Sequence, residues 1–282
     1  MLETILMHEP TVRLVCFAVV FGSMLLWEVL APRRRLSLSR LTRWPSNLGV
    51  FALNTMIVRI GLPTAAVGFA VFAAQQGWGL LNIVALPFWL AVPLAVVLLD
   101  LAIYLQHVVF HAVPVFWRLH RMHHADQDFD VTTAARFHPI EILLSMGLKF
   151  IVVVALGAPA LAVLIFEVVL NGMAMFNHGN VRLPAGLDRA LRMLFVTPDM
   201  HRVHHSVTPR ETNSNFGFNL SVWDRLFGTY RAQPAAGHAD MTIGLERFRT
   251  PRDQRLDQML LQPFRGPADT MPVVRQHGQP TV

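Results

Sequence analysis

The sequence predicts an all-α protein that is embedded in a membrane and carries a helical cap. Only 15% of its 282 residues are charged and 53% are apolar, whereas soluble globular proteins carry roughly 25% charged residues. Several apolar runs reach the length of about 20 residues that a membrane-spanning helix needs. Thirteen histidines are present, and most of them form short clusters. We therefore expect about four to five membrane-embedded helices and a cap in which the histidines gather.

The first apolar run covers residues 12–30. It is longer than the apolar core of a cleaved signal peptide, so we expect a retained membrane-spanning helix. The connection that follows is rich in arginine, and such loops stay on the cytoplasmic side of the membrane. The N-terminus is therefore expected outside. The arginines of this connection are Arg33, Arg34, Arg35, Arg40 and Arg43.

Two further runs, residues 48–74 and 83–111, are expected to cross outward and back inward. The connection between them carries no charge, which is typical of a short outer loop, and arginines return after the third run. The next apolar stretch, residues 141–177, is interrupted by Gly157, Ala158 and Pro159. Its halves of about 16 to 19 residues form either two thin spanning helices or a hairpin that enters the membrane and returns. No further span is expected after residue 181.

These runs divide the chain into three regions. Residues 1–94 contain the N-terminal spanning helices, residues 95–231 contain the histidines and the membrane hairpin, and residues 232–282 form a tail that we expect to be partly disordered. The single cysteine, Cys16, excludes a disulfide framework and a thiolate metal site. Because the arginines flank apolar segments instead of forming one basic face, an anionic membrane surface, and not nucleic acid, is their expected partner.

The histidines recur at helical spacing. One pair is separated by three residues, and the pattern His-x2-His-His occurs twice, at residues 120–124 and 201–205. Positions i, i+3 and i+4 share one face of a helix, so each motif should direct its imidazoles at one point. Imidazole is the commonest protein ligand of transition metals. The predicted topology places all clusters on the cytoplasmic side, where two ions with four or five ligands each would use His107, His111, His120, His123, His124, His178, His201, His204 and His205.

Ligand type alone does not choose the metal, because nitrogen ligands suit iron, zinc, copper and nickel. The sequence lacks His-Glu-x2-His and Glu-x2-His motifs, which disfavours zinc peptidases and carboxylate-rich di-iron bundles. A membrane zinc hydrolase would need a carboxylate base, for which Glu141 and Asp199 are the local candidates. A metal transporter would need ionisable residues across the middle of several spans. The remaining loop histidines, His8, His238 and His277, are interpreted as solvated.

Two polar stripes run along the spanning segments toward the histidines. The first contains Asp100 and Tyr104, and the second contains Glu167 and Asn171. Metal-bound imidazoles commonly donate their second N–H to a carboxylate or carbonyl, so Asp100 and Tyr104 are expected to orient ligands. The alternative is a polar contact between helices, for example between Glu167 and Arg59.

The order of these motifs resembles that of the fatty acid hydroxylase/sterol desaturase superfamily, whose members are integral-membrane, histidine-rich di-iron enzymes. The resemblance covers roughly residues 95–231, about half of the chain. The matching motifs are Asp100-x3-Tyr104-x2-His107, Arg136-Phe137-His138-Pro139-x-Glu141, Asn177-His178-Gly179-Asn180, Pro198-Asp199-Met200-His201, Asn215-Phe216-Gly217 and Trp223-Asp224-Arg225-Leu226-Phe227-Gly228-Thr229.

The resemblance implies that the nine histidines hold two irons, and that O2 and two electrons are used to hydroxylate, or desaturate, an unactivated C–H bond of a lipid such as a fatty acyl chain or a sterol. By analogy with short members, hydroxylation is favoured. Some members have a two-histidine motif where this chain has only His178, so His138 is a further candidate ligand. Asn180 and Asp199 are expected to support the ligands. The residues expected to form a structural motif are Asn215, Gly217, Trp223 and Asp224.

The electrons must come from another protein. The sequence contains no dinucleotide-binding fingerprint, no cysteine cluster for an iron–sulfur centre and no fused haem-binding segment. We expect a separate reductase with a ferredoxin or cytochrome b5-like carrier, which Arg118, Arg121 and Arg202 could dock if they do not contact lipid phosphates. The expected location is the bacterial inner membrane, with the metal site on its cytoplasmic face.

Overall fold

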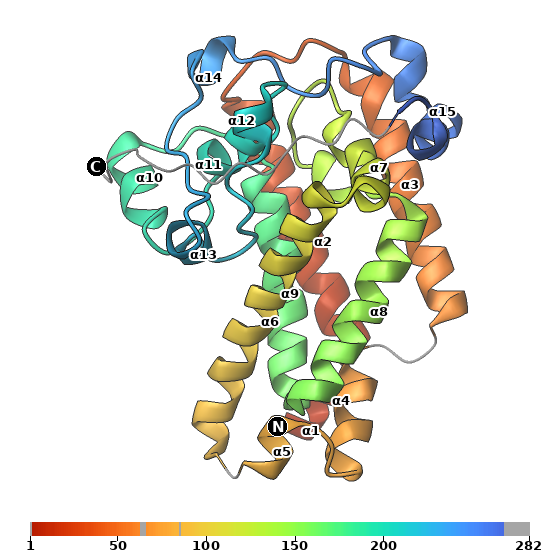
Figure 1. Ribbon diagram of the computed structural model, residues 1–282, viewed down its shortest axis with the longest axis vertical. Helices are drawn as coiled ribbons and strands as arrows, with labels where there is room; N and C mark the ends of the chain where they lie inside the picture. Colours follow the sequence, from red (N-terminus) through yellow and green to blue (C-terminus); the bar gives the residue numbers. More distant parts are fainter. Residues whose placement is uncertain (1, 63–65, 85, 268–282) are drawn as a thin grey trace.

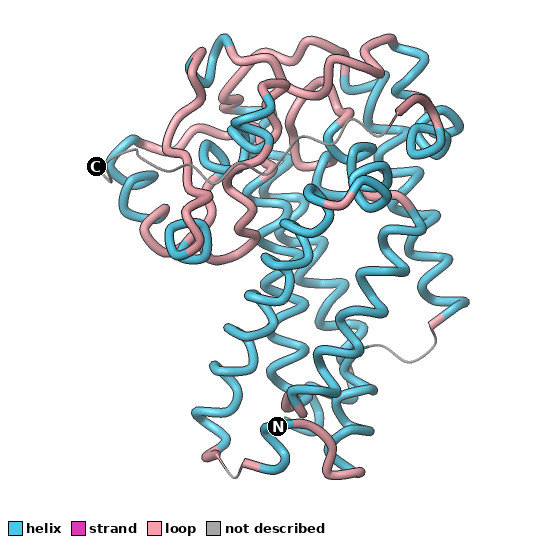
Figure 2. Tube along the Cα trace, viewed as in Figure 1, coloured by secondary structure: helices cyan, strands magenta, loops and turns pink. Residues whose placement is uncertain are grey.

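The computed structural model describes residues 2–62, 66–84 and 86–267. Within these ranges the regular elements are helices, joined by loops and three isolated antiparallel bridges (Figure 2). The predicted all-α class is confirmed. The molecule has two parts, a stem of long helices and a cap of short helices and loops at one end of the stem (Figure 1).

The stem consists of long apolar helices. In the described residues, five segments are long and apolar enough to cross a membrane, which agrees with the predicted number. The second of these segments, Arg40–Ile83, contains three helices, and its residues 63–65 lie outside the described part. The stem helices are α2 (Glu9–Leu30), α3 (Arg40–Gly61), α4 (Ala66–Gln75), α6 (Phe88–Ala112), α8 (Pro139–Leu156) and α9 (Ala160–Asn177), accompanied by the short α1 (Leu2–Met7) and α5 (Leu80–Ile83).

The stem is apolar both in its interior and on its outer surface. Small and aromatic side chains from α4, α6, α8 and α9 pack inside it, including the fully buried Phe166. Its outer side chains are equally apolar, and Ile60, Trp89 and Ile151 are each at least 67% exposed. Water would penalise such a surface, whereas lipid does not. The interruption in the apolar stretch 141–177 is a tight turn in which Gly157 has a φ of 61°, so two complete helices of 18 residues each are formed.

The cap follows the stem at the end where α2 leads into α3 (Figure 1). The cap is neither a sheet nor a helical bundle, because its short helices alternate with loops. The cap elements are α7 (Pro114–His124), η1 (Thr133–Ala135), α10 (Ala185–Leu191), α11 (Pro198–His204), α12 (Pro209–Thr212), α13 (Val222–Leu226), α14 (Gly237–Asp240), η2 (Pro251–Gln254), α15 (Leu256–Leu261) and η3 (Gln262–Phe264).

Buried polar groups hold the cap to the stem. Arg43, predicted as a loop arginine, lies in α3 and is fully buried, with its guanidinium 2.5 Å from Asp126 and 2.6 Å from Asp130. Helix α3 therefore begins earlier than the predicted apolar run, because carboxylates of the cap neutralise the charge of the Arg43 guanidinium. In the predicted tail, Gln254 accepts a hydrogen bond from Arg136 at 2.8 Å. The tail packs on the cap up to residue 267, and residues 268–282 lie outside the described part.

Candidate metal centre

The nine clustered or flanking histidines come from four segments that end in the cap. Two lie in the last turns of α6, and three end α7, which begins directly after α6 with Pro114 in its first turn. His178 follows α9. The last three belong to α11 and the residue after it, where the side chain of Thr197 caps the helix by accepting a hydrogen bond from the backbone N–H of Met200. Helix ends thus carry all nine rings into the cap.

The rings form two groups, and every ring is buried. In each group the ligand atoms lie within 4.8 Å of one another. Five side chains form the first group, which we call the five-histidine group: His107, His111, His120, His124 and His204. Four side chains form the second, the four-histidine group: His123, His178, His201 and His205.

Each His-x2-His-His motif is divided between the two groups. His120 and His124 join the five-histidine group, whereas His123 joins the other; in the second motif, His204 leaves His201 and His205. The expectation that each motif points at one place is therefore wrong. Positions i and i+4 differ by only about 40° around a helix, but positions i+3 and i+4 differ by about 100°. Each motif consequently reaches both groups.

The hydrogen bonds of four rings define their tautomers. His107, His178 and His204 each place Nδ1 within 2.8 Å of a backbone carbonyl oxygen, contributed by Phe216, Ala174 and Ser214 respectively. A carbonyl can only accept, so Nδ1 carries the hydrogen and Nε2 presents a lone pair. His120 Nδ1 lies 2.6 Å from a carboxylate oxygen of Glu141, which fixes the same tautomer.

Two lone pairs face one another. The Nε2 atoms of His107 and His120, both without a hydrogen, are 3.1 Å apart, and two such nitrogens repel unless a cation lies between them. The Nε2 of His178 lies 3.1 Å from those of both His123 and His201. Nitrogens about 2.1 Å from one ion and about 90° apart are separated by about 3.0 Å. The observed spacing fits shared metal ligation.

Burial favours the neutral form of two of the cap imidazoles. It lowers the pKa of His178 to about 4 and that of His204 to about 3. Among the described residues, both ring nitrogens of His124 and of His205 have no hydrogen-bond partner, nor has the Nε2 of His111. Buried polar atoms without partners are costly, and a bound cation would satisfy them. Residues of the right type and spacing are therefore present for two metal ions.

The residues expected to orient the ligands lie elsewhere. Asp100 accepts from the indole of Trp223 at 2.8 Å, and the Tyr104 hydroxyl lies 2.9 Å from that of Thr229. The side chain of Asn180 binds the backbone of Arg34, and Asp199 pairs with Arg33 and Arg202. In the described part of the chain, none of the four is bonded to one of the nine rings. They fix the loops around the site.

Ligand orientation comes instead from Glu141, from three backbone carbonyls, and from Asn213, whose amide oxygen lies 3.3 Å from the Nδ1 of His111. Glu141 was visible in the sequence, in the motif after Arg136, but it was considered only as a base. The carbonyls have no side-chain signature, so the sequence contained no signal for them.

The predicted structural motif shapes the loop that supplies two of these carbonyls. Asp224 accepts hydrogen bonds from the backbone N–H groups of Phe216 at 2.7 Å and Gly217 at 2.8 Å. A Cβ at Gly217 would lie 2.6 Å from the Asp224 carboxylate. Asn215 adopts a φ of 53° and donates to the carbonyls of Met200 and Arg231. This loop thereby presents its carbonyls to the five-histidine group.

The other histidines of the described residues lie outside both groups. His138 caps α8, since its Nδ1 accepts from the backbone N–H of Ile140, and its Nε2 lies 3.3 Å from the carbonyl of Leu260. His8 is exposed as expected, and His277 lies outside the described residues. His238 was interpreted as solvated, which is wrong: it is buried, 3.7 Å from Asp199.

Three further interpretations change. Glu167 pairs with Lys149 at 2.8 Å and Arg13 at 3.0 Å, and not with Arg59. Arg121 and Arg202, considered for docking of a carrier, are buried and bonded inside the cap. Their charges are satisfied by carbonyls and by Asp199, so they present no surface to an acidic protein.

Comparison with known proteins gives the family. The sequence profile of the fatty acid hydroxylase family matches residues 92–229, which contain all nine histidines. Ornithine lipid hydroxylase OlsE of Rhizobium tropici is 34% identical over 157 residues, which are 56% of this chain and 46% of that protein. Alkylglycerol monooxygenase of Homo sapiens is 30% identical over 48% of this chain and 29% of its own length.

Cholesterol 25-hydroxylase of Rattus norvegicus is 27% identical over 50% of this chain and 47% of its own length. The chain thus spans less than half the length of each of these three relatives. No solved structure matches. The apolar helices and this similarity make it an integral membrane protein. The histidine-bearing segment of the chain, residues 92–229, thus carries the sequence pattern of the fatty acid hydroxylase family.

Proposed function

We propose that the protein is a membrane-bound di-iron oxygenase that uses O2 and two electrons to hydroxylate an unactivated C–H bond of a lipid. The main observation in support is that nine buried imidazoles form two groups inside the segment that matches the family. The iron pair, when bound, supplies O2 activation. Hydroxylation is preferred to desaturation because the three relatives described above are hydroxylases and monooxygenases.

The protein's own groups hold and insulate the ions. The five-histidine group and the four-histidine group would each hold one iron, and the carboxylate of Glu141 makes His120 a stronger donor. Burial of all nine rings excludes water from the reacting centre. Asp199 is paired with arginines and Glu141 holds a ring, so neither is free to act as the base of a zinc hydrolase.

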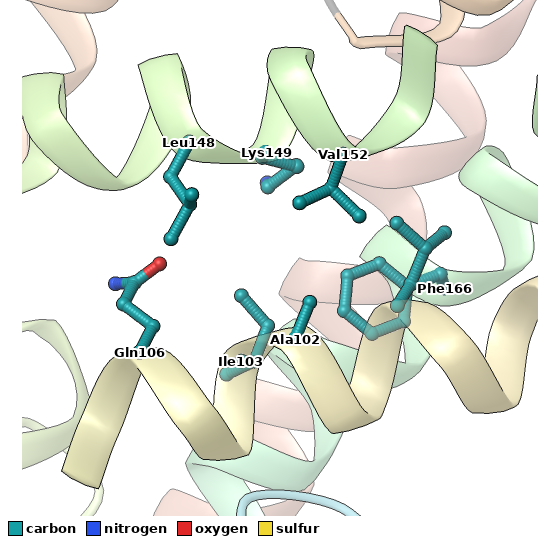
Figure 3. A pocket seen from close by; sticks show the side chains of 8 residues that line it. Ala102, Ile103, Gln106, Leu148, Lys149, Val152 and Phe166 are labelled. Carbon is teal, nitrogen blue, oxygen red and sulfur yellow. The ribbon is translucent and has the colours of Figure 1, made fainter. Parts of the chain in front are cut away.

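A narrow crevice between α6 and α8 offers a route for the substrate (Figure 3). Ala102, Ile103 and Gln106 of α6 face Leu148 and Val152 of α8 across it, with Phe166 of α9 behind. Its volume of about 10 Å³ holds roughly one water molecule. Gln106 bridges to Ser145 of α8 at 2.7 Å and immediately precedes His107. We infer that a hydrocarbon chain enters here from the bilayer when α6 and α8 separate.

The electron donor in this proposal is a separate reductase with a ferredoxin or cytochrome b5-like carrier. The arginine-rich connection before α3 supports a cytoplasmic position for the cap and the two groups. The membrane in this proposal is the inner membrane of a bacterium. Exposed cap residues are then available to a soluble carrier.

Metal analysis and lipid analysis test the proposal together. The purified protein should contain two irons per chain, and cells that express it should accumulate an oxygenated lipid only in the presence of O2. A His204→Ala variant should lose both iron and product. One zinc per chain, with turnover in the absence of O2, would replace the proposal with a hydrolase.

A further inference from the structure

The underside of the cap carries an exposed apolar face outside the spanning helices. It is formed by α10, α13 and the residues next to them, which project sideways beside α6 (Figure 1). Six large apolar side chains of these segments are between 40% and 70% exposed, and we call them together the overhang face: Leu187, Met193, Leu194, Phe195, Leu226 and Phe227. Apolar side chains gathered in this way on a surface mark contact with protein or membrane.

The two segments of the overhang form one unit. Phe195 and Leu220 make an antiparallel bridge, and the backbone N–H of Ser221 donates to the carbonyl of Leu194 at 2.9 Å. The Ser221 hydroxyl donates to the carbonyl of Arg192 at 2.7 Å. Helices α10 and α13 have seven and five residues, far fewer than a membrane span needs. The unit can therefore lie on a membrane without crossing it.

Contacts with α6 place this unit at membrane depth. Trp89, 75% exposed at the start of α6, belongs at the far membrane surface, where tryptophan concentrates. A hydrocarbon core of about 30 Å then extends about 20 residues along the helix, to near His107. Asp100 and Tyr104 lie within this length. Asp100 accepts from Trp223 of α13 at 2.8 Å, and Tyr104 stacks on Phe227 at 5.3 Å between ring centroids.

The charges of the overhang fit the same environment. Arg192 is paired with Asp188, and Arg225 donates to the carbonyl of Arg192 at 3.0 Å, so these two charges are used internally. Arg182 and Arg189 are exposed on the same segment. Apolar side chains beside exposed arginines are typical of elements that lie in the membrane interface, where the arginines contact lipid phosphates.

We propose that α10, α13 and residues 192–195 form an interfacial membrane anchor. The overhang face lies among the acyl chains of the leaflet next to the cap, and Arg182 and Arg189 contact its anionic headgroups. The cap is thus held to the membrane at a second place, beside α6. This anchor is independent of the proposed reaction, because it rests on exposure, depth and charge alone.

A fluorescence experiment tests the anchor. Because Cys16 is the single cysteine, a Cys16→Ser parent allows one nitrobenzoxadiazole label at Leu194→Cys or Leu226→Cys. The full-length, metal-loaded protein is placed in vesicles of phosphatidylethanolamine and phosphatidylglycerol. Leu14→Cys, at a position 63% exposed on α2, is the lipid reference, and Leu261→Cys, at a position 45% exposed on α15 of the cap, is the matched apolar control.

Labels at both overhang positions should be quenched by nitroxide lipids about threefold or more strongly than the Leu261→Cys label, and should resist aqueous iodide, as the Leu14→Cys label does. Quenching by iodide would place the face in water and overturn the anchor. Protection from both quenchers would mean that protein, such as a second copy, covers the face, which would also overturn it. Unchanged metal content and circular dichroism confirm that each labelled variant is folded.

Discussion

The two histidine groups differ in how firmly their rings are held. Four of the five rings in the five-histidine group have Nδ1 next to an acceptor: two carbonyls, one carboxylate and one amide oxygen. In the four-histidine group, only His178 has such a partner among the described residues. Rings that are held before metal arrives lose less freedom on binding. The comparison indicates that one candidate site is preformed and that the other would adjust to a bound ion.

The largest effect is expected from loss of a ligand. His204→Ala and His123→Ala remove one ring from the five-histidine and four-histidine group respectively. Each should lower turnover by more than about 100-fold, since even residues that only support ligands contribute 10–100-fold. Turnover and iron content are measured together, with His8→Ala as the exposed control. Full iron content in the His204→Ala variant would remove the basis of the comparison.

Acid should destabilise the metal-free protein. Burial holds the pKa of His178 at about 4 and that of His204 at about 3, below the ordinary value of 6.5. Between pH 6.5 and these values the unfolded chain binds protons that the folded rings do not. The free energy of unfolding therefore decreases as the pH is lowered, by about 1.4 kcal/mol per pH unit for each ring. Chemical denaturation in detergent from pH 7 to 4.5 measures this slope. A flat profile would mean that the rings are solvated.

Glu141→Gln should separate the two groups. The carboxylate contacts only His120 among the nine rings, so its loss should weaken one of two metal-binding steps by about 10–100-fold and leave the other unchanged. Calorimetric titration of the metal-free protein measures both steps. Glu246→Gln, at an exposed cap position, is the matched control. Equal weakening of both steps would show that the groups act as one.

The smallest effect is expected from Gly217→Ala. Its Cβ would lie 2.6 Å from the Asp224 carboxylate and 2.8 Å from the carbonyl of Leu220, which forces the carbonyl-bearing loop to move. We expect a loss of about 1–3 kcal/mol of stability and weaker metal binding at the five-histidine group. Gly172→Ala, where the added Cβ meets open space in α9, should be neutral or stabilising. Thermal melting with and without metal compares the two variants.

Much of this protein was predictable from local patterns. Apolar runs gave the spanning helices, because lipid requires about 20 apolar residues in sequence whatever surrounds them. The clustered histidines gave the candidate ligands, and the match to the family covers the same segment. The loop motif around Asn215 and Asp224 was also recognisable, through its resemblance to the motifs of the family. The structure shows why these residue types are needed, since Asn215 has a positive φ and the Asp224 carboxylate accepts hydrogen bonds from the loop backbone.

Only the tertiary structure decided how these parts combine. It divided each His-x2-His-His motif between two groups, buried Arg43 and His238, and brought Trp223 to Asp100 in the stem. Each outcome depends on a partner distant in the sequence. The backbone carbonyls that orient the rings are common to all residue types, so no sequence pattern marks them. The sequence by itself determined which segments enter the membrane and which residues can bind metal. Convergence of those residues required the packing of helix ends against one another, which no local pattern encodes.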